Sequence, residues 1–144
     1  MGQKKTRIGP DRGRMPDWSP EGNRIVHIRY PGDSSSDIFV MDSSGGSVLR
    51  LTSSKATDYG PKFSPDAMKI AFYSGYEGDV AVWIVNSDGS NPGRIITGSQ
   101  PSWSPDGKKL AFIGSQAGTI NDNGTVWVVD IDGTNSRQLT YGPR

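Results

Sequence analysis

The sequence predicts an all-β protein, a β-propeller built from three four-stranded antiparallel blades. The first observation is a segment that recurs three times, in which a strand ends in Trp or Phe and is followed by Ser-Pro. The prolines that begin the copies, Pro16, Pro61 and Pro101, lie 45 and then 40 residues apart. Repeats of about 40–50 residues with four short strands are typical of propeller blades. The second observation is that no stretch has the apolar period of a helix.

Composition supports many short strands and excludes several classes of function. Hydrophobic residues make up 33% of the 144 residues, and the 19 Gly and 10 Pro fit frequent turns. A net charge of +1 gives no field that would select nucleic acid. The absence of Cys excludes disulfide and thiolate chemistry. No apolar run reaches the roughly 18 residues of a membrane span.

The copies divide the chain into a tail and three blades. The tail is basic, and its Arg7-Ile8-Gly9-Pro10 run resembles the end of a repeat, so the tail is either frayed or the remnant of an outer strand. The predicted boundaries are 1–15 for the tail, 16–60 for blade 1, 61–100 for blade 2 and 101–144 for blade 3.

The first strand of each blade leads into a tight turn. Its aromatic residue (Trp18, Phe63 or Trp103) is followed by Ser-Pro, an acidic residue and, in two copies, glycine. Proline presets φ for the first central position of a turn and glycine accepts a positive φ, so Ser-Pro-Asp-Gly predicts a hairpin. Ala67 takes the glycine position in the second copy. It should weaken that turn if its φ is positive.

The remaining strands follow in order. The second strand alternates small and large apolar residues, as expected of a strand covered on both faces. The third is rich in β-branched and aromatic residues and is followed by a glycine-containing hairpin turn. The fourth is short and polar, as suits an outer edge, and ends at Thr52, Thr97 or Thr140. The second strands are predicted at 24–28, 69–73 and 109–113, and the third strands at 38–42, 82–86 and 126–130.

These residues carry a resemblance to a known family. The third copy reads Trp-Ser-Pro-Asp-Gly-Lys-Lys-Leu-Ala-Phe over 103–112, Val-Trp-Val-Val-Asp-Ile-Asp-Gly over 126–133 and Arg-Gln-Leu-Thr over 137–140. Together with the matching runs in the other copies, it resembles the TolB-type propeller repeat, and the resemblance covers about residues 16–140. The resemblance implies a propeller whose innermost strand is the one that ends in Trp or Phe. It does not imply a particular ligand or reaction.

Three blades are too few to close a ring, because propellers close with about 4–8 blades. An open array leaves one apolar blade face bare at each end, and soluble monomers avoid such patches. The simplest closure is a homodimer, in which each chain is half of a six-bladed ring and the two joints are equivalent. TolB-like propellers commonly have six blades, so the resemblance favours this count. The alternative is a fragment of a longer propeller, and the initial Met1 and the basic tail argue slightly for a complete gene product.

Alternating strand direction sorts the loops onto two faces. The turns after the first and third strands are short and alike, whereas the loops after the second and fourth strands (29–37, 74–81, 114–125, 53–60 and 98–100) differ between copies. We call the face with these differing loops the variable-loop face, and such a face is often the binding face of a repeat protein. Tyrosine with acidic residues suits a polar or basic partner, although ordinary solvated loops would look similar. The predicted binding residues are Tyr30, Asp33, Asp37, Tyr59, Tyr76, Glu77, Asp79, Asn121 and Asp122.

Four more residues are candidates for the central channel. Three of them stand between the proline and the aromatic residue of each first strand, where alternation turns them away from the aromatic side chain. The fourth is the one histidine of the chain, in a position that Phe72 and Phe112 occupy in the other copies. A packed ring explains this histidine without catalysis, and no second His or Cys completes a zinc site. The candidates are Asp17, Lys62, Ser102 and His27.

The turns rich in Asp and Asn are a weak calcium candidate. Asp130-Ile131-Asp132-Gly133 begins like a calcium loop, but the twelfth position is Tyr141 where the loop needs Glu. Turn chemistry explains these residues, and the sequence predicts no metal and no cofactor.

The favoured function is a non-enzymatic module that binds a protein, a peptide or a small polar ligand. A propeller-borne hydrolase or lyase is the alternative, although the chain has no Gly-x-Ser-x-Gly elbow. A third hypothesis is a set of blades without a ligand. The basic N-terminus has no apolar core of a signal peptide, so a cytoplasmic protein and a processed periplasmic or secreted one both stay open.

Overall fold

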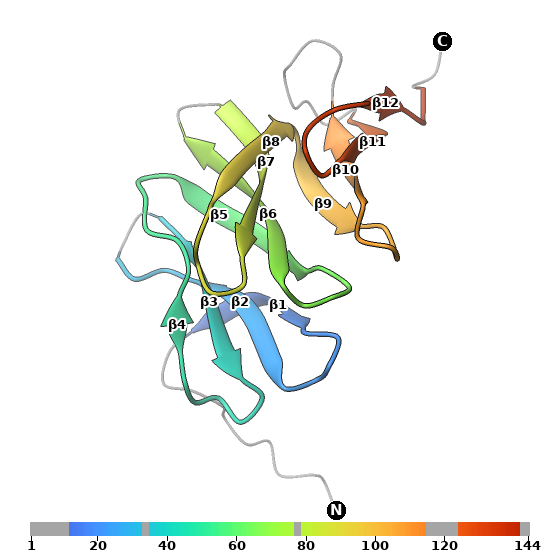
Figure 1. The fold of residues 1–144 in the computed structure, drawn as a ribbon. Helices are drawn as coiled ribbons and strands as arrows, with labels where there is room; N and C mark the ends of the chain where they lie inside the picture. Colours follow the sequence, from blue (N-terminus) through green and yellow to red (C-terminus); the bar gives the residue numbers. More distant parts are fainter. Residues whose placement is uncertain (1–11, 33–34, 77–78, 115–123, 142–144) are drawn as a thin grey trace, which may run out of the picture.

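The computed structural model describes residues 12–32, 35–76, 79–114 and 124–141, which form three separate four-stranded antiparallel sheets (Figure 1). The strand order in every sheet follows the chain, so each sheet is an up-and-down meander joined by hairpins. The predicted all-β fold with three blades is confirmed. The described residues contain no helix, and therefore no helix long and apolar enough to cross a membrane.

The strands of the three blades correspond one to one. Blade 1 consists of β1 (Gly13–Trp18), β2 (Arg24–Arg29), β3 (Asp37–Asp42) and β4 (Leu49–Arg50). Blade 2 consists of β5 (Thr57–Phe63), β6 (Lys69–Tyr76), β7 (Asp79–Asn86) and β8 (Gly93–Thr97). Blade 3 consists of β9 (Ser99–Trp103), β10 (Lys109–Gly114), β11 (Thr125–Asp130) and β12 (Arg137–Gln138).

Several predicted boundaries differ from the observed ones. β4 and β12 end two residues before Thr52 and Thr140. At these ends a threonine hydroxyl replaces the backbone carbonyl as the acceptor for the third strand. The Thr52 hydroxyl accepts the Ile38 N–H and the Thr140 hydroxyl accepts the Val126 N–H, both at 2.9 Å. In blade 2 the predicted loop 74–81 is mostly strand, since β6 and β7 stay paired out to Tyr76 and Asp79.

The Ser-Pro turns are held by side chains as well as by proline. In blade 3 the Ser104 hydroxyl accepts the Lys109 backbone N–H at 2.9 Å and donates to the Asp106 carboxylate at 2.7 Å. That carboxylate also accepts the Lys108 backbone N–H, and these hydrogen bonds lower the pKa of Asp106. The serine hydroxyl holds the turn in this way in all three blades, and the aspartate does so in blades 2 and 3.

Ala67 has the positive φ that the repeat predicts, +61°, against +75° for Gly22 and +71° for Gly107. Its methyl group is buried against blade 1, and its carbonyl accepts a hydrogen bond from the Arg24 guanidinium at 3.1 Å. Burial of the methyl group and this contact between blades offset part of the backbone cost of an L-residue in the left-handed region.

The core lies between the blades and not within any one of them. One apolar cluster joins blades 1 and 2, and a second joins blades 2 and 3. Blade 2 therefore has both faces covered, whereas blades 1 and 3 each have one covered face. The largest members of the first cluster are Ile28, Ile38, Leu51, Phe63, Ile70 and Phe72, and those of the second are Ile84, Leu110, Phe112 and Val129.

The first strands of neighbouring blades lie beside one another: β1 contacts β5, and β5 contacts β9. Each pairs with its second strand through a bulge just before the proline-aromatic segment. At this bulge Met15, Gly60 and Gln100 take nearly the same left-handed φ, between +53° and +55°. The shared bulge therefore bends the three first strands in the same way.

Candidate binding face

The residues predicted for the variable-loop face have different environments. Tyr30 is exposed just after β2, and the Arg14 guanidinium lies 5.7 Å from the centre of its ring. Asp79 is exposed at the start of β7, with Arg94 3.6 Å away. Tyr59 lies in β5 and not in a loop; it is half-buried and stacks on Tyr73 at 5.3 Å. Of Tyr76 only the backbone is described, and Asp33, Glu77, Asn121 and Asp122 lie outside the described residues.

Asp37 is not presented to solvent. It is fully buried at the start of β3, where Arg50 donates to its Oδ2, while its Oδ1 has no hydrogen-bond partner within the described ranges. A second buried carboxylate, Asp58, accepts hydrogen bonds from the Thr52 and Ser74 hydroxyls, both at 2.6 Å. Burial raises the pKa of Asp58, and the negative charge of Asp37 adds to the rise. Asp58 therefore ties the end of blade 1 to blade 2, whereas Asp37 joins β3 to β4 within blade 1.

His27 is buried, and its surroundings favour the uncharged form of the ring. Its ring stacks on Phe39 at 6.2 Å, and its Nε2 accepts a hydrogen bond from the Arg29 Nε at 3.1 Å. Burial lowers the pKa of His27, and the positive charge of Arg29 lowers it further. Its Nδ1 is buried without a hydrogen-bond partner in the part of the chain that the structure describes. The ring is therefore enclosed in blade 1, as a packed residue would be.

The other channel candidates connect neighbouring first strands. Asp17 in β1 accepts the backbone N–H of Phe63 at 3.0 Å, and its carboxylate lies 3.7 Å from the Lys62 ammonium group. The carbonyl of Lys62 in turn accepts the indole N–H of Trp103 at 3.0 Å. Ser102 is exposed at the corresponding position of β9. These residues thus hold one blade to the next, and Ser102 has no following blade within this chain.

The two outer blade faces carry apolar residues that are buried elsewhere in the repeat. Trp18 is 58% exposed, whereas Phe63, its counterpart in blade 2, is 6% exposed. Leu139 is 42% exposed, whereas Leu51, its counterpart in blade 1, is 8% exposed. The backbone N–H of each leucine bonds to the equivalent carbonyl of the third strand, so the positions match. The difference in exposure comes from the missing neighbour and not from the local fold.

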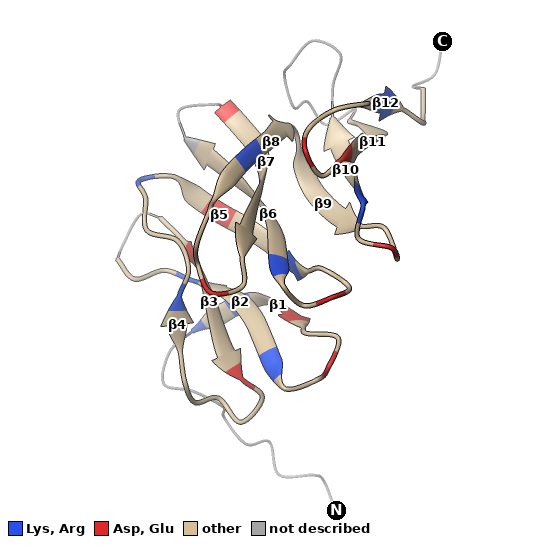
Figure 2. Cartoon of the chain, viewed as in Figure 1, with Lys and Arg blue, Asp and Glu red and all other residues tan. Residues whose placement is uncertain are grey.

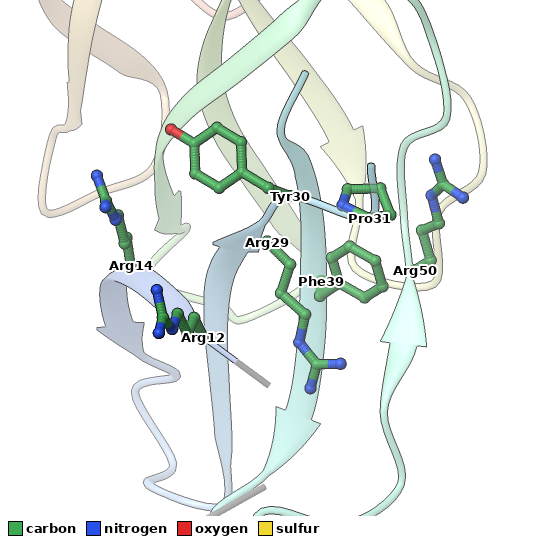
Figure 3. A pocket seen from close by; sticks show the side chains of 7 residues that line it. All are labelled: Arg12, Arg14, Arg29, Tyr30, Pro31, Phe39 and Arg50. Atoms are coloured by element: carbon green, nitrogen blue, oxygen red, sulfur yellow. The ribbon is translucent and has the colours of Figure 1, made fainter. Parts of the chain in front are cut away.

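The structure also brings together a group of arginines that the sequence analysis did not select. Arg12, Arg14, Arg29 and Arg50 line a pocket of about 730 Å³ beside Tyr30 and Phe39, which we call the arginine pocket (Figure 3). Arg50 lies on an outer strand, as do Arg94 of β8 and Arg137 of β12 (Figure 2). A comparison of the charge at each equivalent position of the three copies, in addition to loop length, would have identified Arg12, Arg14 and Arg29.

Comparison with known proteins gives a consistent result. Residues 3–144 match the family described as the TolB beta propeller domain. An uncharacterized protein of Agrobacterium fabrum is 32% identical over 130 residues, which covers 85% of this chain and 44% of that protein. Dipeptidyl-peptidase 5 of Porphyromonas gingivalis is 27% identical over 143 residues, 87% of this chain and 20% of the peptidase.

A solved structure from Agrobacterium tumefaciens, provisionally described as TolB, superposes with a TM-score of 0.77 at 30% identity. The match covers 92% of this chain and 50% of that one. This chain therefore spans about half the length of the first relatives that it matches, or less. The repeat motifs, the three meander blades and the family match agree, and the chain belongs to the TolB beta propeller domain family.

Proposed function

We propose that this chain is a non-enzymatic propeller module that binds its ligand on the variable-loop face, and that two copies close into a six-bladed ring. The observation that carries the proposal is the pair of bare end faces. Trp18 at one end and Leu139 at the other are exposed, although their counterparts between blades are buried. The length of the match to the structure from Agrobacterium tumefaciens, half of that chain, agrees with a half ring.

Contacts within the chain suggest how the ends would meet. The Trp103 indole donates to the carbonyl of Lys62 in the preceding blade. Ser102 corresponds to Lys62, and Trp18 corresponds to Trp103. By this repeat, the Trp18 indole of one copy would donate to the Ser102 carbonyl of another, and Leu139 would enter an apolar joint like the one that encloses Leu51. Both joints of the ring would be alike, as twofold symmetry requires.

A pair of substitutions tests this assembly. Trp18→Glu places a charge in the proposed joint, where desolvation disfavours it, so the variant should be monomeric by light scattering at concentrations at which the wild type is dimeric. Met68→Glu is the matched control, because Met68 is 64% exposed in the hairpin between β5 and β6, away from both ends. Equal masses for the wild type and both variants would contradict the proposed joint.

A hydrolase or lyase is the second candidate, and the match to a named peptidase favours it. That protein is much longer than this chain, and similarity of the propeller alone does not transfer a reaction. A screen for hydrolase and lyase activity, with His27→Ala as the comparison, separates the two candidates. Activity that disappears in this variant while the fold is kept would replace the binding proposal with an enzymatic one.

A further inference from the structure

The arginine pocket is a concave site on blade 1. Arg12 lies just before β1, Arg14 near its start, Arg29 at the end of β2 and Arg50 in β4, so the four arginines come from three neighbouring parts of the blade. Figure 3 shows Phe39 between Arg29 and Arg50, with Tyr30 on the side of Arg14. The volume of about 730 Å³ is in the range of small-molecule sites in proteins.

The pocket concentrates positive charge in a chain whose net charge is close to zero. The net charge of the whole chain is +1, yet four arginines meet here. No acidic side chain is among the described residues that line the pocket, and the carboxylate that Arg50 binds, Asp37, is fully buried. Arg50 is therefore already paired with an anion, whereas no ion pair of Arg12 or Arg14 occurs within the described ranges, so these two guanidinium groups are the ones that a bound anion would join.

The propeller scaffold does not require these charges. At the positions of Arg12, Arg14 and Arg29, blade 2 has Thr57, Tyr59 and Ser74. Blade 3 has Thr97, Ser99 and Gly114 at the same positions. All six of these are uncharged, and blades 2 and 3 fold in the same way as blade 1. The three arginines are therefore specific to blade 1, and the repeat fold itself does not require them.

Two aromatic rings orient the guanidinium groups. Arg29 and Arg50 lie 5.1 and 6.0 Å from the centre of the Phe39 ring, and Arg14 lies over Tyr30. Arg29 donates through its Nε to His27, and Arg50 donates to the Asp37 carboxylate and the Thr52 carbonyl, so both are already engaged. The N–H edge of a guanidinium such as that of Arg14, stacked over a ring, matches the paired oxygens of a carboxylate or a phosphate. We propose that the arginine pocket binds the phosphate or carboxylate groups of a small anionic ligand.

The test is isothermal titration of the full chain with inorganic pyrophosphate and, separately, with citrate, at low ionic strength, where screening is weak. Saturable binding of either probe to the wild type is expected, and the better probe tells which oxyanion the pocket prefers. The double substitution Arg12→Gln and Arg14→Gln should lower the affinity at least tenfold. No binding of either probe to the wild type would overturn the proposal.

The matched control is the double substitution Arg94→Gln and Arg137→Gln, which removes the same charge from the outer strands β8 and β12, outside the pocket. This control should change the affinity less than threefold. An equal loss in both double variants would mean that the probes respond only to net charge, and it would overturn the site. Circular dichroism of both variants separates loss of binding from loss of fold.

This inference stands apart from the proposed ring. A monomeric chain that binds pyrophosphate in the pocket would keep the anion site and refute the ring. A dimer that binds neither probe would keep the ring and refute the site.

Discussion

His27 shows how one residue departs from the repeat and what that departure costs. Phe72 and Phe112 fill the same position in the other blades with an apolar ring. His27 instead buries an Nδ1 atom that has no partner among the described residues and places its Nε2 against a charged arginine. A buried donor without an acceptor costs about 1–3 kcal/mol.

We therefore expect His27→Phe to stabilise the chain by about 1 kcal/mol near neutral pH, because the unpaired donor is removed while ring packing is kept. Because the pKa of His27 is lowered in the folded state, the wild type should lose stability as the pH falls below about 6.5, where the unfolded histidine takes up a proton first. The Phe variant should lack that part of the loss. Urea unfolding between pH 7 and pH 5 measures both effects, and identical slopes for the two proteins would contradict this account.

The left-handed position before the proline-aromatic segment gives a second prediction for single residues. Gly60 and Gln100 have nearly the same positive φ. A Cβ on Gly60 would lie 2.9 Å from the Tyr73 ring. Gln100 is exposed, and its backbone already carries the strain of the left-handed region. Gly60→Ala should cost about 1–2 kcal/mol, and Gln100→Gly should gain about 0.5 kcal/mol. The two melting temperatures test this, and a stabilising Gly60→Ala would show that the positive φ is not imposed by the fold.

At the scale of the strands and blades, stability comes from the joints. No blade contains its own core, and the apolar residues of each sheet are buried by the neighbouring sheet. Leu51 illustrates this, because it follows the last strand of blade 1 but packs with Phe63, Ile70 and Phe72 of blade 2.

Leu51→Ala should therefore destabilise the chain by about 2–5 kcal/mol, as removal of a buried leucine does in well-packed cores. Val48→Ala is the control, because Val48 is 39% exposed just before the same strand and lies outside the apolar clusters; it should cost less than about 0.5 kcal/mol. Chemical unfolding of both variants measures the difference. Similar small losses would mean that the blades fold independently of the joint.

The strands and hairpins could be predicted from the sequence, because the residues that form a turn are neighbours along the chain. Ser-Pro-Asp-Gly and Asp-Gly mark the hairpins wherever they occur, and alternation marks the strands. The length of the β6–β7 hairpin could not be read, because its last pairs depend on cross-strand contacts such as Gly75 with Val80. The burial of Asp37 and the position of the four arginines around one pocket could not be predicted from the sequence either, because both depend on contacts between residues of different strands.

At the scale of the whole molecule, the described residues form three blades, and the two outer blades each have one face that no other blade covers. The chain belongs to a propeller family, and it covers half of the structure from Agrobacterium tumefaciens. The exposure of Trp18 and Leu139 marks the surfaces at which further blades would pack. We propose that a second copy of the chain provides these blades, because twofold symmetry makes the two joints alike.

The most direct test of this account is the mass of the wild-type chain in solution, measured by light scattering on a sizing column. One chain has a mass of 15.5 kDa. The account predicts a stable species of twice that mass over a wide range of concentrations, since both joints of the ring must open together for it to dissociate. A folded, dispersed monomer at high concentration would contradict the closed ring and leave the end faces as sites for other partners.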